Sequence, residues 1–328
     1  MITLASDNHH KSLHTWPLWL TVLIVMTAAL TWPAMKAPIL LDDESSFRHV
    51  SEFTGWSDVF KADAFGLFRP AKNAIFYLFA PGDSINLTLW HSLVLASFLV
   101  SIAAVFFMLR VLLRSDLGAL VGATIWTLTP TQSCLAVWMS CINISMCVIF
   151  LAVFVMLHIR ASKSDKPMSG TFILASLSMF LAQASYETAV ASAGLAFLID
   201  ELIEERRPFK RRLPAYILYS AVTLGFLAIR FIAGTNVESH GLNEGFHPDI
   251  EPWQQSASAG WFMMQHLLMW LAPLGRIEFA STYLWGVSAT PLELILSWCA
   301  VITLLLTAWF SRKSMPLLSL GLLWFFGT

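Results

Sequence analysis

Three consecutive carboxylates, Asp42, Asp43 and Glu44, stand in the stretch PILLDDESSFRH at residues 38–49. The cluster follows an apolar run closely and has apolar residues on both sides, so we expect it to lie against a membrane surface. A carboxylate in such a partly desolvated place can have a raised pKa and act as a general base near neutral pH. A solvated loop beside a membrane span would explain the same residues, and chemistry alone does not decide between the two.

The charged residues that follow point to an anion site near the same surface. In the stretch DVFKADAFGLFRPAKNAIFYL, Asp63 precedes Arg69, and an arginine at a bilayer surface offers a fork of donors suited to phosphate. Arg230 stands near the end of a later apolar run, where it would bind a phosphate or only extend to the interface. Glu187 stands between two apolar runs, where it would be functional or part of a hydrogen-bonded kink. An anionic lipid head group is the natural ligand of such residues.

Histidine and cysteine spacing indicates no metal site. No grouping of His, Asp or Glu in the sequence has the spacing that a metal demands, and His91 is in a context more typical of packing than of ligand binding. The four cysteines lie in or beside apolar runs without paired metal spacing, which favours packing. Cys134 and Cys141 would form a disulfide only if both reached an oxidising face.

The composition is that of an integral membrane protein. Of the 328 residues, 57% are hydrophobic and 12% are charged, which is more apolar surface than a soluble domain of this length can bury. The formal net charge is -1 and no basic run lies on a water-facing domain, which argues against nucleic acid as a partner. The first apolar run follows a polar leader and lacks a clean cleavage signal, so we interpret it as a retained anchor.

Apolar runs long enough to cross the hydrocarbon core predict nine membrane spans. They are expected at 16–33, 86–109, 117–137, 141–159, 170–186, 188–203, 214–233, 291–310 and 315–328. Cytoplasmic loops collect Lys and Arg, and nine spans with the N-terminus inside put most basic residues on the inner side. The run 260–275 would weaken that bias if it were a tenth span, so we expect an interfacial or re-entrant helix there, on the outer face.

The predicted fold class is therefore all-α, a polytopic helical membrane bundle that forms one transmembrane domain over residues 1–328. Two long loops, 34–85 and 234–290, fall on the exported side and hold most of the acidic residues. Long loops on a rigid helical scaffold are where function usually lies, so the first is the expected catalytic loop. The chain stops at the apolar LLWFFGT, which we interpret as a truncated C-terminus or a last span that ends abruptly.

Motifs in a fixed order along the chain carry a resemblance to a known family. They are LLDDESSF, ADAFGLFRPAKNAIFYL, NLTLWHSL, WTLTPTQSCLAVWMSCINIS, ASYETAVA, AIRFIAG, MMQHLLMWLAPLG and LLWFFGT. Over essentially its whole length the chain resembles the GT-C class of polytopic glycosyltransferases, and in particular protein O-mannosyltransferases of the transmembrane and tetratricopeptide-repeat kind. The resemblance implies transfer of a sugar from a polyprenyl-phosphate donor on the exported side, with Asp42 or Asp43 in the place of the family's catalytic base.

The chain also departs from the pattern of that family. Thr129 and Pro130 stand where the relatives usually have His-Pro, and Asn143 and Ile144 stand where they have an Arg-Asp pair. These departures leave the identity of the donor and acceptor open. They also leave open a non-catalytic member of the family.

We therefore predict a glycosyltransferase in a multi-pass protein of the bacterial inner membrane, with its active face in the periplasm. Its partners would be membrane lipid, a lipid-linked sugar and a protein or glycan acceptor, with no metal and no cofactor. The predicted catalytic residues are Asp42 and Asp43, and the predicted substrate-binding residues are Glu44, Asp63, Arg69, His91, Glu187 and Arg230. The alternatives are a transporter or flippase of a lipid-linked substrate and a non-catalytic membrane assembly subunit. Spans nearly free of charge at mid-depth favour the transferase over the transporter.

Overall fold

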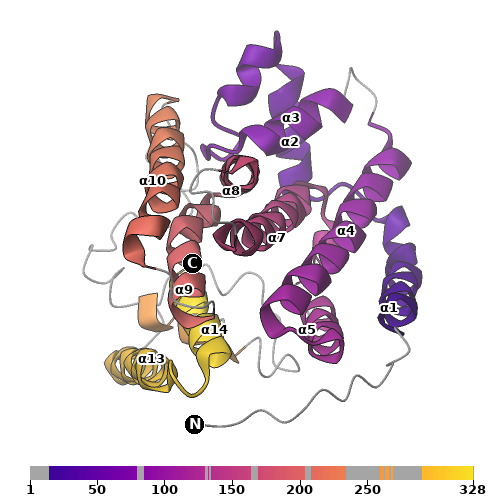
Figure 1. Cartoon of the computed structure of the whole chain (residues 1–328). Coiled ribbons are helices and arrows are strands. Elements are labelled where there is room, and N and C mark those ends of the chain that lie inside the picture. Colours follow the sequence, from indigo (N-terminus) through magenta and orange to yellow (C-terminus); the bar gives the residue numbers. More distant parts are fainter. Residues whose placement is uncertain are drawn as a thin grey trace.

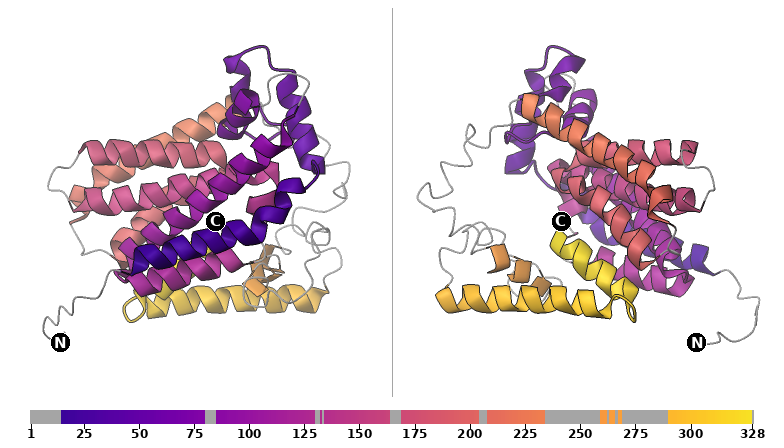
Figure 2. Two further views of the ribbon diagram at one scale, coloured as in Figure 1. Left: turned by 90° about the vertical axis from the view of Figure 1, so that its right-hand side faces the viewer. Right: turned by 60° about the vertical axis from the view of Figure 1, so that its left-hand side comes forward.

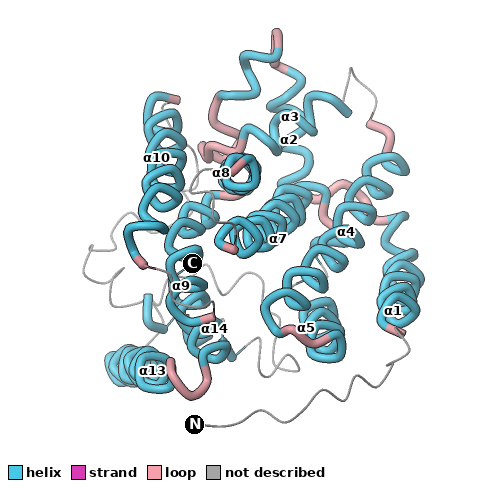
Figure 3. Tube along the Cα trace, viewed as in Figure 1, coloured by secondary structure: helices cyan, strands magenta, loops and turns pink. Residues whose placement is uncertain are grey.

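The structure is a computed structural model, and it describes residues 15–79, 85–129, 132, 134–163, 169–203, 208–233, 259–261, 263–265, 267–268 and 290–327. Within these ranges the chain forms a bundle of helices and contains no strand (Figure 1, Figure 3). The predicted all-α helical bundle is confirmed.

The described helices run from Trp16 to Gly327. They are α1 (Trp16–Thr31), η1 (Trp32–Lys36), α2 (Leu41–Ser51), η2 (Trp56–Phe60), α3 (Pro70–Phe79), α4 (Leu87–Leu113), α5 (Asp116–Leu128), α6 (Cys134–Val137), η4 (Met139–Cys141), α7 (Ile142–Ser162), α8 (Gly170–Ser185), η5 (Glu187–Ala191), α9 (Ser192–Leu202), α10 (Phe209–Ile232), α13 (Pro291–Ser311) and α14 (Pro316–Gly327).

Side-chain caps fix where several helices begin. The side chains of Asn86 and Ser115 each accept the backbone N–H three residues further on, at the starts of α4 and α5. At the start of α13, Thr290 and Glu293 cap each other's backbone N–H groups. Such caps satisfy N–H groups that have no partner within the helix. The helix boundaries are therefore encoded locally.

Five segments are long and apolar enough to cross a membrane. They are Trp16–Lys36, Leu87–Leu113, Met139–Ser162, Phe209–Ile232 and Pro291–Ser311. A hydrocarbon core of about 30 Å needs about 20 residues of helix, at about 1.5 Å per residue. These five segments meet that requirement on length and composition.

Large apolar side chains on these helices face outward. Leu18 and Leu30 of α1, Ile217 of α10, and Ile295 and Phe310 of α13 are all exposed. A water-soluble monomer rarely carries so much contiguous apolar surface, whereas lipid requires it. The chain is thus a membrane protein, with these faces toward the bilayer.

Each of the nine expected spans contains a described helix, but α5, α8, α9 and α14 are shorter than a full span. α5 ends at Leu128 because Thr129, which precedes Pro130 in the sequence, is extended with a ψ of 125°. The range expected at 188–203 opens with the 3-10 turn of η5 before α9 begins. Beyond the five long segments, the number of spans stays a prediction.

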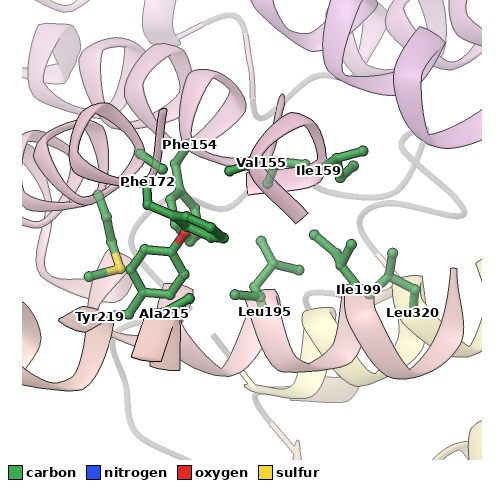
Figure 4. Packing of buried hydrophobic residues seen from close by; sticks show 13 residues of the cluster. Phe154, Val155, Ile159, Phe172, Leu195, Ile199, Ala215, Tyr219 and Leu320 are labelled. Atoms are coloured by element: carbon green, nitrogen blue, oxygen red, sulfur yellow. The ribbon is translucent and has the colours of Figure 1, made fainter. Parts of the chain in front are cut away.

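The largest apolar core lies among α7, α8, α9 and α10, and α14 packs against it (Figure 4). Phe154 and Ile159 of α7, Ile199 of α9 and Tyr219 of α10 are fully buried there, and Leu320 brings in α14. Close packing of this kind makes the four helices a rigid scaffold. The breaks at their ends are therefore held in defined positions.

The helices of the first predicted outer loop lie at one end of the bundle, together with η4 and α8. α2 and α3 lie together beyond the start of α4, near the end of α10 (Figure 1, Figure 2). α2 contacts η4 and α3 contacts α8. At the opposite end, Arg110 pairs with Asp116 at 2.6 Å between α4 and α5, and Arg212 pairs with Glu201 at 2.7 Å between α10 and α9. We call the end that holds α2 and α3 the loop end.

The second long loop, 234–290, and the interfacial helix expected at 260–275 lie outside the described residues, apart from 259–261, 263–265, 267–268 and 290. The first three of these short pieces are helical.

The helix directions predict which residues face opposite sides of the membrane. Ser57 of η2 is exposed at the loop end, whereas Lys163 follows α7, which runs away from that end. In a background in which the four native cysteines are replaced, a membrane-impermeant maleimide should label Ser57→Cys in intact cells and leave Lys163→Cys unlabelled. Permeabilised cells serve as the control, since both sites should react there. Labelling of both variants from outside would mean that α7 does not cross the membrane.

Candidate functional site

The acidic cluster predicted from the sequence forms the first turn of α2. Asp42, Asp43 and Glu44 all lie in that turn, where carboxylates are favoured by the positive end of the helix dipole. Part of the reason for their position is therefore helix stability. Their surroundings, however, differ sharply from one residue to the next.

Asp43 is buried, with 1% of its surface exposed, and both of its carboxylate oxygens accept hydrogen bonds. Oδ2 accepts the N–H of Leu40 at 3.3 Å, and Oδ1 accepts the N–H of Ser140 at 2.6 Å. The hydroxyls of Ser46 and Ser140 meet beside this bond at 3.4 Å. Asp43 thus caps its own helix and joins α2 to η4.

Asp42 is only partly buried, and no hydrogen bond to its carboxylate is found among the described residues. Burial raises the pKa of Asp42 above the ordinary aspartate value; the positive charge of Lys72 opposes this shift and the charge of Asp43 adds to it. A carboxylate with a raised pKa and an accessible face can accept a proton. Of the two predicted catalytic residues, Asp42 has the environment of a general base.

Glu44 points to a different partner. It is exposed and forms a surface ion pair with Arg48, one turn along α2, at 3.0 Å. Glu44 was predicted as a substrate ligand. In the structure it pairs with Arg48 at the surface and does not join the buried Asp43.

Asp63 organises a tight turn before α3. Its Oδ1 accepts the N–H groups of Phe65 and Leu67 at 2.9 and 3.0 Å. Gly66 within the turn has a φ of 73°, a conformation that glycine adopts without strain. The other oxygen, Oδ2, is buried and accepts no hydrogen bond from the described residues. It faces the cationic side chains of Arg69 and Lys72.

Arg69 and Lys72 share the free oxygen of Asp63. Arg69 Nη1 lies 3.7 Å from Asp63 Oδ2, and Lys72 Nζ lies 3.6 Å from it. Lys72 is almost completely buried, and its ammonium lies over the ring of Phe65, 5.0 Å from the centroid. Burial lowers the pKa of Lys72, although the charge of Asp63 opposes the shift. The spacing leaves donors of both cations available to an anion or to water.

Glu187 is the principal partner of Arg69. The guanidinium donates from Nε to Glu187 Oε2 at 2.8 Å and from Nη2 to Oε1 at 2.6 Å. It also lies over the ring of Tyr186, 4.7 Å from the centroid. Burial alone would raise the pKa of Glu187, but the hydrogen bonds and charge of Arg69 outweigh it and hold the pKa below the ordinary glutamate value. Two residues predicted separately thus form one bidentate pair.

Arg230 lies near the end of α10, and its charge also acts on Glu187. Three cations, Arg69, Lys72 and Arg230, therefore belong to the loop end, among the carboxylates of Asp42, Asp43, Asp63 and Glu187. We call these seven residues the charged cluster.

His91, predicted as a substrate ligand, contacts the backbone in the structure. It is buried in α4, and its Nε2 lies 2.9 Å from the carbonyl oxygen of Ala37, which it would bind as a donor. This contact holds the chain between η1 and α2 against α4. His91 therefore positions the segment that leads into the acidic helix.

Lys72 was not singled out from the sequence, although a signal for it exists. It follows Arg69 by three residues, a spacing that places side chains on one side of a helix. Its burial beneath the rings of Phe65 and Phe76 could not be read from the sequence, because it depends on how α3 packs against α2 and α8.

No family model matches the chain, and no curated protein or solved structure is significantly similar to it. Among the described residues, no group of three or more His, Cys, Asp or Glu side chains could hold a metal ion. The charged cluster is accordingly interpreted from its own geometry. It combines a half-buried carboxylate with Arg69 and Lys72, two cations that share one oxygen of Asp63.

Breaking the pair of Arg69 and Glu187 should destabilise the protein. We expect Arg69→Gln or Glu187→Gln to reduce the free energy of unfolding by roughly 3 kcal/mol, the lower range for a buried pair that loses one partner. The double variant should lose less than the sum of the two single losses, because the partners interact directly. Denaturant unfolding in detergent measures all three.

The matched control is the exposed pair of Glu44 and Arg48. Glu44→Gln and Arg48→Gln should each change the free energy of unfolding by less than about 1 kcal/mol. Equal effects at the buried and exposed pairs would contradict the structural role of Arg69 and Glu187.

Proposed function

We propose that the chain is a glycosyltransferase that moves a sugar from a polyprenyl-phosphate donor to a protein or glycan acceptor. The observation that carries the proposal is the half-buried Asp42 with a raised pKa, set beside Lys72 at the loop end of a membrane bundle. The resemblance to GT-C enzymes supports the same reading, as does the presence of a helix in each of nine predicted spans. In this proposal the loop end is on the exported face, which in a bacterial inner membrane is the periplasmic side.

The proposed reaction assigns the proton to Asp42. The acceptor hydroxyl oxygen attacks the anomeric carbon of the sugar while its proton passes to the carboxylate of Asp42. The bond between the anomeric carbon and the phosphate oxygen breaks, and polyprenyl phosphate leaves with the bonding electrons. Asp43 cannot take this role as readily, because both of its oxygens already accept backbone N–H groups.

The negative charge of the leaving phosphate requires cations nearby. Arg69 and Lys72 differ in how many of their donors are free to bind it. The fork of Arg69 is occupied by Glu187, which leaves mainly Nη1 for a ligand. Lys72 has no hydrogen bond among the described residues, and its ion-pair partner is Asp63, whose Oδ2 lies 3.6 Å from Nζ. We therefore add Lys72 to Arg69 and Arg230 as the residues that would bind the phosphate of the donor. Cations in a water-poor site stabilise a developing phosphate charge more than they would in water.

The transporter alternative would need ionisable groups near mid-membrane. The buried polar network outside the charged cluster joins His158 of α7 to Asp200 of α9 at 3.2 Å and to Tyr219 of α10 at 3.2 Å. His158 is four residues from the end of α7, so this network lies toward the end opposite the loop end. Its position favours a structural link over a transport path.

The first test of the proposed function is product release by Asp42 variants. Purified protein is incubated with labelled polyprenyl-phosphate sugars, and release of polyprenyl phosphate is measured. Asp42→Asn should lower the rate by about 10²–10⁴-fold, the usual contribution of a general base, with little change in Tm. Asp43→Asn should instead lower the free energy of unfolding by about 1–3 kcal/mol, since the amide leaves a buried N–H poorly bonded. Glu44→Gln is the neutral control.

A rate for Asp42→Asn within about tenfold of wild type would remove its role as the base. If wild type released no polyprenyl phosphate from any donor, the proposed transferase activity would be contradicted. A transporter or a membrane assembly subunit would then be favoured.

The second test uses pH. Asp42 must be deprotonated to act, and its raised pKa places the acid limb of kcat/KM above the ordinary aspartate value. Lys72 lowers the pKa of Asp42, so Lys72→Met should move this limb to higher pH. Lys61→Met is the matched control, because Lys61 is exposed and paired with Asp58 at 2.7 Å. An acid limb that stays in place in Lys72→Met would contradict the coupling of the two residues.

A further inference from the structure

The thiols of Cys134 and Cys141 are hydrogen-bonded to each other at the loop end. In a continuous α-helix, seven residues would separate the two Cα atoms by about 10 Å, beyond the roughly 7 Å that a disulfide tolerates. The helix is not continuous, because Trp138 between α6 and η4 is extended, with φ -89° and ψ 116°. This break brings the two side chains together.

Turns on both sides of Trp138 hold the break in place. The N–H of Trp138 donates to the carbonyl of Cys134 at 2.9 Å, and the N–H of Cys141 donates to the carbonyl of Trp138 at 3.0 Å. Both cysteines are half-buried, so a small reagent can reach them, whereas Cys147 is buried. Cys141 directly follows Ser140, whose N–H bonds to Asp43, and this places the pair beside the charged cluster.

The segment between the two cysteines carries the bond that anchors the acidic helix. Ser140 precedes Cys141, and its N–H donates to Asp43 Oδ1 at 2.6 Å. Any restraint on residues 134–141 therefore acts on the position of α2. Two thiols in contact across such a segment are suited to form that restraint.

We propose that Cys134 and Cys141 are a modification site, at which an external disulfide converts the two thiols to a disulfide that closes residues 134–141. The proposal rests on the proposed function only for the exported position, where such oxidants persist. The bridge fixes η4 and, through Ser140, the acidic helix. The chemistry itself needs no transferase activity.

The reaction is a pair of thiol–disulfide exchanges. One cysteine thiolate attacks a sulfur of the external disulfide, forms a mixed disulfide and releases one thiolate. The second cysteine thiolate then attacks the cysteine sulfur of the mixed disulfide and releases the other thiolate. Two electrons pass from the cysteines to the external disulfide, and the two protons lost by the cysteines end on the released thiols.

The test uses the purified full chain in detergent with oxidised glutathione. After exchange, free thiols are alkylated, the protein is digested, and peptides are identified by mass spectrometry with and without reductant. We expect Cys134 and Cys141 mainly in a linked form that is two hydrogens lighter, and the exposed Cys299 alkylated or carrying glutathione. Recovery of Cys134 and Cys141 mainly as alkylated thiols or separate glutathione adducts would overturn the proposal.

A stability measurement tests the effect on the acidic helix. Oxidation should raise the Tm of wild type by a few degrees, because closing a loop restrains the unfolded chain. It should also at least halve the loss of Tm caused by Asp43→Asn, since the bridge then holds η4. Cys134→Ser should abolish both effects and Cys299→Ser should keep them. An equal loss from Asp43→Asn in both redox states would refute the link to the acidic helix.

The two proposals fail separately. A chain that links Cys134 to Cys141 but releases no polyprenyl phosphate would keep the modification site and lose the transferase. A chain that releases polyprenyl phosphate with both thiols resistant to oxidation would do the reverse.

Discussion

The bidentate bond between Arg69 and Glu187 joins the loop after α1 to the break between α8 and α9, 118 residues further along the chain. An exposed pair of this kind would contribute little. Here the side chains of Arg69 and Glu187 are only 12% and 24% exposed, and either charge left alone would be strongly unfavourable. The loop must therefore fold back onto the helices. Once Arg69 is fixed at the start of α3, Lys72 follows within one turn, and Asp63 lies close to both cations.

The same geometry separates two neighbouring carboxylates. Successive residues of an α-helix point about 100° apart, so Asp42 and Asp43 cannot share one environment. Asp43 turns toward η4, where Ser140 supplies a backbone N–H, and its buried charge is thereby satisfied. Asp42 turns to a partly open place near Lys72, where its charge is only partly compensated. A buried, hydrogen-bonded carboxylate and a partly exposed one thus arise from adjacent positions, and the first anchors the helix that carries the second.

Apolar length and charge asymmetry were sufficient to locate a helix in every expected span, because these signals depend only on local composition. They could not show that α5 ends at Leu128, before the end of the expected run. They also could not show which carboxylate of the acidic turn is buried, because the partner of Asp43 is a backbone N–H 97 residues away, which leaves no mark on the residue types nearby. The partnership of Glu187 with Arg69 was hidden in the same way. His91 and Glu44 were predicted as substrate ligands, and their hydrogen-bond partners in the structure are Ala37 and Arg48.

The departures from the glycosyltransferase pattern acquire a physical meaning from these contacts. Thr129 stands where the resembling family has a histidine, and its hydroxyl donates to the carbonyl of Ile125 within α5 at 2.8 Å. Asn143 stands where the family has a charged residue; it is buried, and its Oδ1 accepts the N–H of Ile144 at 2.9 Å. Neither residue supplies a charge to the loop end. A phosphate donor bound there would depend on the three cations of the loop end, Arg69, Lys72 and Arg230, and Glu187 already engages two of the donors of Arg69.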